Sequence, residues 1–239
     1  MEELLGYLLD DPAHPLAQQV KAWLASSRRF RAFVSEFKPK IRKKLRSAKT
    51  REQQEELGLE LETAYLLLTE KAFSLSYEPL TAGQGRAPDF AVKFTSSNQF
   101  FLEVTRLRTI GLEPQTHPFQ SERFVTLIAN KLGQLQAGSS NLLIIGIESD
   151  TRQPDLPGAM LQIQQRAEKN DPSLVTRYGF QNRKQFFQHY QRLSALVLRP
   201  LNQPVGSAPL FWDNPQTRFP LTSKIRTAVL RSQATLLDL

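Results

Sequence analysis

The sequence predicts an α/β (α+β) protein whose helices cover a mixed central sheet, and three observations lead to this class. Apolar residues recur at helical spacing over residues 51–72. Three short segments with strand character follow between residues 73 and 107. After a further helix, residues 141–147 form a nearly continuous apolar run, which is typical of a central parallel strand. The predicted core therefore has the order helix, three-strand meander, helix, strand.

Residues 1–50 predict helices that precede this core. The first helix is expected to stop near Pro12, and the second to end at about Ala25. The pair Ser26-Ser27 can start a third helix. We expect Pro39 to break or restart this third helix, which leaves residues 40–47 as one or two basic helical turns.

The elements of the core can be bounded from the same patterns. The helix over 51–72 carries an apolar stripe, and Glu60 lies beside this stripe. The other helix of the core is expected from Ser121 to about Leu135. The predicted strands of the meander are 73–77, 89–94 and 99–107.

The C-terminal part predicts a further strand with covering helices. Helices are expected at 160–169, 182–192 and 221–230, a strand at 194–198 and an aromatic turn at 211–215. We therefore divide the chain into a basic helical N-terminal segment, 1–50, and an α/β domain, 51–239, with a core at 51–148 and an α/β extension at 149–239.

Positive charge is concentrated in one segment of the chain. The 239 residues carry a formal net charge of +8, whereas residues 28–51 alone hold eleven basic residues against one acid, Glu36. The segment is therefore +10 and the rest of the chain is −2. A polyanion such as nucleic acid is the natural partner of such a segment, and a solvated helix face is the alternative. The candidate nucleic-acid-binding residues in this segment are Arg28, Arg29, Lys40, Arg42, Lys43, Lys44 and Arg46.

Composition excludes several kinds of site. Cysteine is absent and there are only three histidines, so the sequence supports neither disulfides nor a zinc site with cysteine ligands. No run of about 18 apolar residues is present, and the N-terminus lacks the pattern of a signal peptide. We expect a cytoplasmic protein that does not interact with membranes.

Two acidic residues stand inside strand-like segments. Asp89 and Glu103 are separated by thirteen residues, which is enough for two antiparallel strands and a turn. Carboxylates on adjacent strands can share one face and reach one hard cation, and oxygen-rich sites of this kind hold Mg²⁺ or Mn²⁺. Such ions activate water and stabilise a phosphoryl transition state, so the pair suggests metal-dependent phosphodiester cleavage. The alternatives are a turn acid after Pro88 and an edge-strand salt bridge at Glu103.

With the element order, the residues Glu60, Pro88-Asp89 and Glu103-Val104-Thr105 resemble the PD-(D/E)XK nuclease superfamily, the restriction-endonuclease-like fold. The resemblance covers about residues 50–148. It implies that Asp89 and Glu103 bind Mg²⁺ or Mn²⁺, together with the backbone carbonyl of Val104. It also implies that Glu60 adds a carboxylate from the helix, with Glu62 as the second choice.

The chain departs from the superfamily pattern at one position. The lysine expected two residues after Glu103 is Thr105, which can form hydrogen bonds but supplies no positive charge. Lys131 in the next helix is a candidate substitute, with Gln134 as a supporting residue one turn later, although Lys131 could equally be a solvated helix residue. We expect strand alternation to point Arg106 away from the site, where it is a candidate phosphate contact.

The resemblance and the charge together predict a metal-dependent nuclease that acts on DNA. The alternative is a catalytically inactive nucleic-acid-binding module on a nuclease-like fold, which the threonine at position 105 favours. RNA is a weaker candidate for the polyanion than DNA. Since many members of the superfamily cut as dimers, a homodimer is a further expectation.

Overall fold

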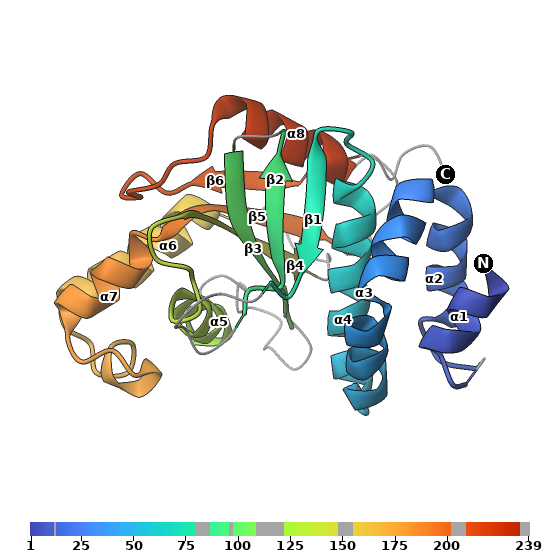
Figure 1. Ribbon diagram of the computed structural model, residues 1–239. Coiled ribbons are helices and arrows are strands. Elements are labelled where there is room, and N and C mark those ends of the chain that lie inside the picture. Colours follow the sequence, from blue (N-terminus) through green and yellow to red (C-terminus); the bar gives the residue numbers. More distant parts are fainter. Residues whose placement is uncertain are drawn as a thin grey trace.

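The computed structural model describes residues 1–11, 13–79, 87–95, 98–108, 122–147, 155–201 and 209–234. Their centre is one mixed sheet of six strands, which lie side by side in the order in which they occur along the chain (Figure 1). The strands are β1 (Phe73–Tyr77), β2 (Phe90–Phe94), β3 (Asn98–Leu107), β4 (Ser140–Ile147), β5 (Leu193–Pro200) and β6 (Leu210–Asp213).

Strand direction changes across this sheet. β1, β2 and β3 form an antiparallel meander, in which Phe90 pairs with Leu102. β3, β4 and β5 are parallel, and β6 returns antiparallel at the edge. The predicted meander and the predicted central parallel strand are therefore both confirmed, and the protein is of the α/β class with a mixed sheet.

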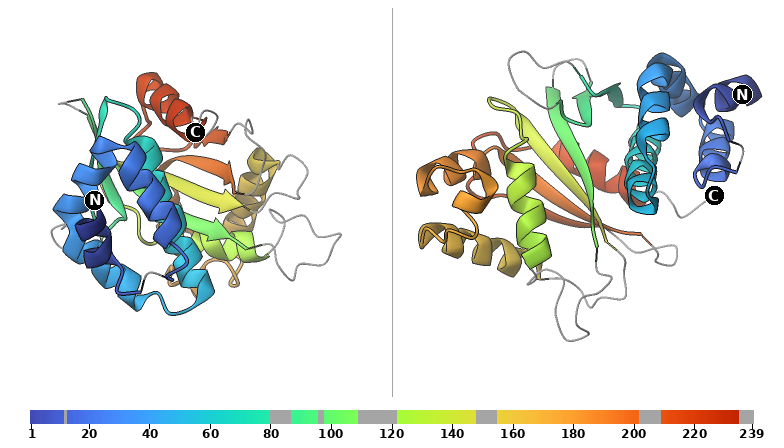
Figure 2. Two further views of the ribbon diagram at one scale, coloured as in Figure 1. Left: turned by 90° about the vertical axis from the view of Figure 1, so that its right-hand side faces the viewer. Right: turned by 90° about the horizontal axis from the view of Figure 1, so that it is seen from below.

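Helices cover both faces of the sheet, so that the protein has three layers (Figures 1 and 2). Successive residues of β4 alternate between the two layers of core. Leu142 and Ile144 pack on the side of α4, whereas Leu143 and Ile145 pack on the side of α5. The helices described are α1 (Glu2–Leu8), α2 (Ala17–Ser26), α3 (Arg28–Ser47), α4 (Arg51–Leu67), α5 (Glu122–Leu132), α6 (Leu156–Glu168), α7 (Arg183–Tyr190) and α8 (Ser223–Ala234), with a 3₁₀ turn, η2 (Thr176–Tyr178).

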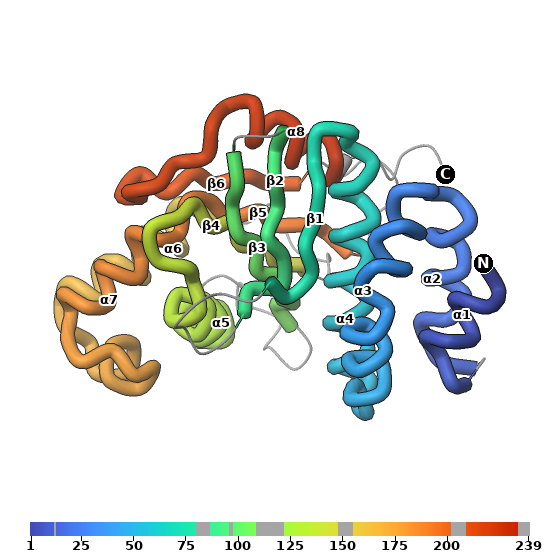
Figure 3. Tube along the Cα trace, in the orientation of Figure 1, coloured from blue at the N-terminus to red at the C-terminus, as the bar shows by residue number. Residues whose placement is uncertain are grey.

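The N-terminal helices lie along α4 at one end of the molecule, and α6 and α7 lie at the other end (Figure 3). α1, α2 and α3 share one hydrophobic core with α4, α8 and strands of the sheet. The segment 1–50 is thus packed into the body of the fold. No helix among the residues placed by the structure is long and apolar enough to cross a membrane.

The structure corrects three predicted elements. α3 continues as one helix of 20 residues through Pro39, because buried residues on both sides of the proline, Val34 and Ile41 among them, hold it against the core. α4 ends at Leu67 and not at residue 72. The predicted aromatic turn begins as strand β6, where Trp212 pairs with Leu196.

Candidate active site

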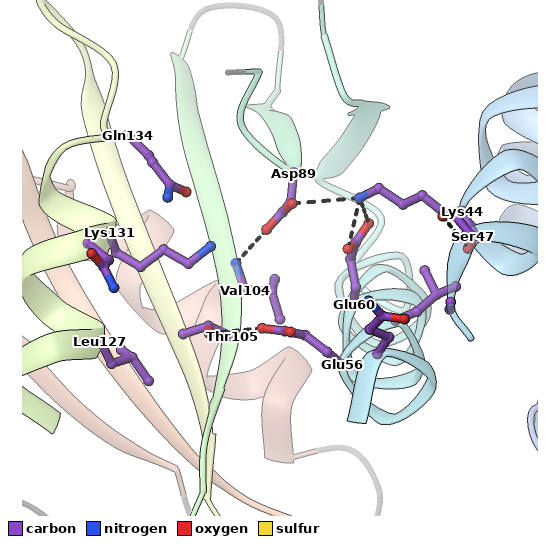
Figure 4. Close-up of a pocket in the computed structure, with 14 residues that line it drawn as sticks. Lys44, Ser47, Glu56, Glu60, Asp89, Val104, Thr105, Leu127, Lys131 and Gln134 are labelled. Atoms are coloured by element: carbon purple, nitrogen blue, oxygen red, sulfur yellow. Dashed lines mark hydrogen bonds and ion pairs between the residues drawn. The ribbon is translucent and has the colours of Figure 1, made fainter. Parts of the chain in front are cut away.

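Most of the candidate site residues line one cavity of about 500 Å³ between α3, α4, β3 and α5 (Figure 4). The cavity therefore draws side chains from segments that are far apart in the sequence. Its lining residues are Lys44, Ser47, Ala48, Gln53, Glu56, Leu57, Glu60, Asp89, Val104, Thr105, Leu127, Asn130, Lys131 and Gln134.

Asp89 is tied to the neighbouring strand. It lies immediately before β2, and its side chain is buried. Asp89 Oδ2 accepts a hydrogen bond of 2.8 Å from the backbone N–H of Val104 on β3. This contact joins residues that are 15 positions apart in the sequence, so Asp89 does more than cap a local turn. It holds the carboxylate beside the strand that carries Glu103.

Lys44 of α3 brings three carboxylates to one point. Its Nζ lies 2.7 Å from Glu60 Oε1 and 3.8 Å from Asp89 Oδ1 (Figure 4). Glu78 Oε1 is 3.1 Å from the same nitrogen. From the sequence, Lys44 was predicted to be a nucleic-acid contact in a basic segment. Its side chain instead forms ion pairs inside the cavity, with an exposed fraction of 26%.

The pKa values in this cluster reflect crowded charge. Burial, followed by the negative charge of Asp89, raises the pKa of Glu60 to about 7, although Lys44 acts against both. Burial acts to lower the pKa of Lys44, but the carboxylates of Glu60 and Asp89 outweigh it and the pKa lies above its ordinary value. Burial and the charge of Glu60 also raise the pKa of Tyr77 well above its ordinary value.

Glu103 is held by a second lysine. Lys131 Nζ lies 2.8 Å from Glu103 Oε2, and both side chains are buried. Lys131 belongs to α5, so the helix that follows the meander delivers an ammonium group to the acid on β3. The alternative of a solvated surface lysine at position 131 is therefore wrong.

Two further carboxylates of α4 contact β3. Thr105 Oγ1 donates a hydrogen bond of 3.1 Å to Glu56 Oε1, and Glu56 lines the cavity one helical turn before Glu60 (Figure 4). Arg106 forms an ion pair with Glu55 and does not line this cavity, in agreement with the predicted alternation along β3. Glu56 was not predicted, although its four-residue spacing from Glu60 is a signal that could have identified it.

The remaining carboxylate considered for the site lies elsewhere. Glu62 Oε2 is 2.5 Å from Arg199 Nη2, and Arg199 is buried on β5. The choice of Glu60 over Glu62 as the helix residue of the site is consistent with this geometry.

The acidic side chains at the cavity offer carboxylate oxygens, which are the type of ligand that Mg²⁺ and Mn²⁺ prefer. Among the residues that the structure describes, five carboxyl groups lie in or beside the cavity together with the two ammonium groups of Lys44 and Lys131. The five are Glu56, Glu60, Glu78, Asp89 and Glu103. Gln134 Oε1, a buried acceptor on the cavity wall, has no hydrogen-bond partner.

The ammonium groups of Lys44 and Lys131 lie against the carboxylates that a metal ion would need as ligands. In the described ranges, no three acidic or histidine side chains lie close enough to hold a metal ion as they stand. Asp89 and Glu103 contact different lysines on separate helices. A divalent ion would therefore have to compete with at least one ammonium group for its carboxylate ligands.

Several basic residues of α3 bind within the protein. Arg29 donates to the backbone carbonyls of Leu68 and Glu70 at 2.6 and 2.7 Å, and Lys40 Nζ donates to that of Glu78 at 2.6 Å. Arg42 and Arg46 form ion pairs with Asp10 at 2.9 and 2.6 Å. Of the candidate nucleic-acid contacts on α3, Arg28, Lys43 and Arg46 are exposed.

No protein-family model, no curated protein and no solved structure matches the chain. A function therefore has to be inferred from the residues and their arrangement.

Proposed function

We propose that the protein is a metal-dependent nuclease that hydrolyses phosphodiester bonds of DNA, with a core arranged as in the restriction-endonuclease-like fold. The observation that carries this proposal is the cavity between α4, β3 and α5. Buried Glu60 and Asp89 line this cavity and pair with Lys44. Lys131, which also lines it, pairs with buried Glu103 behind the wall, and Thr105 stands at the position of the missing motif lysine.

The oxygen atoms of Asp89 and Glu103 and the backbone carbonyl of Val104 would hold Mg²⁺ or Mn²⁺, with Glu60 as an additional carboxylate. When bound, such an ion activates a water molecule and stabilises negative charge on phosphate. Burial of Glu60, followed by the like charge of Asp89, disfavours ionisation of Glu60 even beside Lys44, and a divalent ion would supply further positive charge there.

Positive charge for the scissile phosphate comes from a residue outside β3. Lys131 reaches the cavity from α5 and would take the role of the motif lysine, which is replaced by threonine at position 105. Its ammonium group would stabilise the charge that develops on the phosphate oxygens during in-line attack. Thr105 donates its hydroxyl proton to Glu56, so the oxygen lone pairs of this hydroxyl can accept a hydrogen bond from a water molecule in the cavity.

A cleavage assay tests the proposal. We expect the protein to cut supercoiled plasmid, linear duplex or single-stranded DNA in Mg²⁺ or Mn²⁺, and EDTA to abolish the activity. Asp89→Asn and Glu103→Gln should remove cleavage, and Lys131→Gln should lower it at least 100-fold. Asp213→Asn is the matched control, because Asp213 is exposed on β6 and pairs with Arg226 at 3.5 Å. Equal cleavage by the Asp89 and Asp213 variants would refute the site.

A second candidate is a catalytically inactive nucleic-acid-binding module. The observation that favours it is that ammonium groups already neutralise Asp89 and Glu103, as they would in a site that has lost its metal. Binding of Mn²⁺ measured by calorimetry separates the two candidates. The nuclease must bind the ion and lose it in the Asp89→Asn variant, whereas the module has no need to bind it. The same assay with an RNA substrate tests the choice of DNA.

A further inference from the structure

A second cavity of about 350 Å³ adjoins the carboxylate cavity and shares Glu56 and Leu127 with it. It lies where the end of β3, the first turn of α4, the first turns of α5 and the 3₁₀ turn η2 meet. Four arginines from three of these elements border it, namely Arg106, Arg108, Arg123 and Arg177.

Three of these arginines have exposed side chains. Arg108, Arg123 and Arg177 are exposed, whereas Arg106 is half-buried and forms its ion pair with Glu55. The Arg177 guanidinium lies 5.8 Å from the centre of the Tyr178 ring. Tyr178 Oη is 2.6 Å from Thr126 Oγ1 of α5, and this contact holds η2, and with it Arg177, beside the helix that carries Arg123.

The acids on the same wall reduce the positive charge only in part. Glu122 is engaged by Arg166 at 2.7 Å, and Arg166 itself does not border the cavity. Glu52 has a pKa below its ordinary value, chiefly through a hydrogen bond with Thr50, and the charge of Arg108 contributes to the shift. Among the described residues that border the cavity there are four arginines and three glutamates, and Arg106 and Glu122 each have a partner outside it, Glu55 and Arg166.

We propose that this arginine-bordered cavity binds the phosphates of the nucleic-acid strand next to the scissile bond. The proposal rests on the proposed function, since it extends the same site along the substrate. Guanidinium groups suit this ligand because they form paired hydrogen bonds with phosphate oxygens. The shared wall at Glu56 and Leu127 would let one strand run from the arginines into the carboxylate cavity.

The basic helix α3 is the competing surface. Its Arg29, Lys40 and Lys44 are committed to carbonyl or carboxylate groups within the protein, as described above. Of its exposed basic residues, Lys38 lies over the Tyr7 ring and Arg46 pairs with Asp10. The other two, Arg28 and Lys43, are fifteen residues apart on one helix, which corresponds to about 22 Å at a rise of about 1.5 Å per residue. They do not border either of the two cavities.

Equilibrium binding of the full chain to a fluorescent duplex and a single strand, in EDTA and at several salt concentrations, tests the proposal. In the double variant Arg108→Gln/Arg177→Gln we expect affinity to fall about tenfold or more at 0.1 M salt. The slope of log K against log salt should decrease by about 0.9 for each lost duplex phosphate contact, and by about 0.7 for a single strand. Lys184→Gln/Lys224→Gln removes two exposed positive charges elsewhere and should leave both quantities unchanged.

The results separate this proposal from the proposed function, because no cleavage takes place in EDTA. Loss of affinity in the arginine variant, but not in the lysine control, supports the phosphate site whether or not the wild-type protein cuts DNA. Unchanged affinity and slope in the arginine variant overturn the phosphate site, even if cleavage in Mn²⁺ is intact. A loss confined to Arg28→Gln/Lys43→Gln would also overturn it and would assign binding to α3. Circular dichroism of each variant confirms that the fold is retained.

Discussion

At the residue scale, the central feature is that carboxylates on β3 and beside β2 are neutralised by lysines from helices on both sides of the sheet. Lys44 comes from α3 and Lys131 from α5. Each lysine places a positive charge beside a buried acid, which offsets part of the cost of burying a carboxylate. The lysines therefore stabilise the protein in the absence of a metal ion. A metal ion that binds here must displace at least one ammonium group from its carboxylate partner.

Glu60 gives this competition a pH dependence. Burial is the largest cause that raises the pKa of Glu60 from the ordinary value of 4.5 to about 7, and the negative charge of Asp89 is the next. A carboxyl group whose pKa is raised by folding contributes stability that is complete below pH 4.5 and is lost as the pH rises through 7. Each pKa unit corresponds to about 1.4 kcal/mol, so the free energy of unfolding should fall by about 3 kcal/mol over this range.

The measurement is urea unfolding in EDTA between pH 4.5 and 8 for the wild type and for Glu60→Gln. We expect the variant, which has no titrating group at position 60, to lose most of the pH dependence in this window. An equal slope in both proteins would show that other groups account for it.

Which site residues the sequence could reveal depends on how local their signals are. Asp89, Glu103 and Thr105 lie on adjacent strand segments, so their spacing was informative. Lys131 was accessible to prediction because a helix that covers a sheet can return one side chain to it. Lys44 was not recognised, because it is one of eleven basic residues in its segment and its carboxylate partner Glu60 is 16 positions away.

At the element scale, α3 shows how a local rule concealed a long-range contact. A proline inside a helix removes one backbone hydrogen bond, and for this reason we expected a break at Pro39. The helix continues because its apolar face is buried on both sides of that residue. With the break removed, Lys44 follows Phe37 and Ile41 on one helical face, and its position inside the cavity becomes the natural one.

Replacement of Pro39 by alanine should stabilise the protein. The change restores the backbone N–H donor in the middle of α3, while the greater freedom of the unfolded chain offsets part of the gain. We expect the free energy of unfolding in urea to rise by about 1–2 kcal/mol. Pro157→Ala is the matched control, because Pro157 lies at the start of α6, where proline is tolerated, and this variant should show no gain. A loss of stability in Pro39→Ala would mean that the native helix requires the bend.

The strands were predictable to different degrees for a physical reason. β4 carries apolar side chains on both of its faces because each face packs against a hydrophobic core. Its position could therefore be predicted from the continuous apolar run in the sequence. β6 is an edge strand of four residues with half-buried side chains, so it lacks such a signal, and the following Asn214-Pro215 favoured a turn. The pairing of β5 with β4 depends on contacts across more than fifty residues, which no local pattern encodes.

At the scale of the whole molecule, the N-terminal helices are part of the body that carries the site. Aromatic side chains connect the two: Phe30 of α3 meets Tyr65 of α4 with ring centres 5.7 Å apart, and Phe33 meets Tyr77 of β1 at 5.9 Å. The sequence predicted the charge of this segment, but not that its apolar face completes the core. That face could be attributed to the core only once its partner surface on α4 and β1 was known.

Deletion of residues 1–50 should therefore unfold the remainder of the chain. It would expose Tyr65, Tyr77 and Phe90, which are now buried against α2 or α3, and burial of each aromatic side chain is worth about 1.5–3 kcal/mol. The summed loss is comparable with the whole stability of a domain, which is about 5–15 kcal/mol. We expect the fragment 51–239 to show no cooperative thermal transition by circular dichroism. The full-length variant Lys44→Met, which removes only the ammonium group from the cavity, should retain that transition. A fragment that unfolds cooperatively would instead establish residues 1–50 as a separable segment, and its cleavage activity would then report on the contribution of that whole segment to the site.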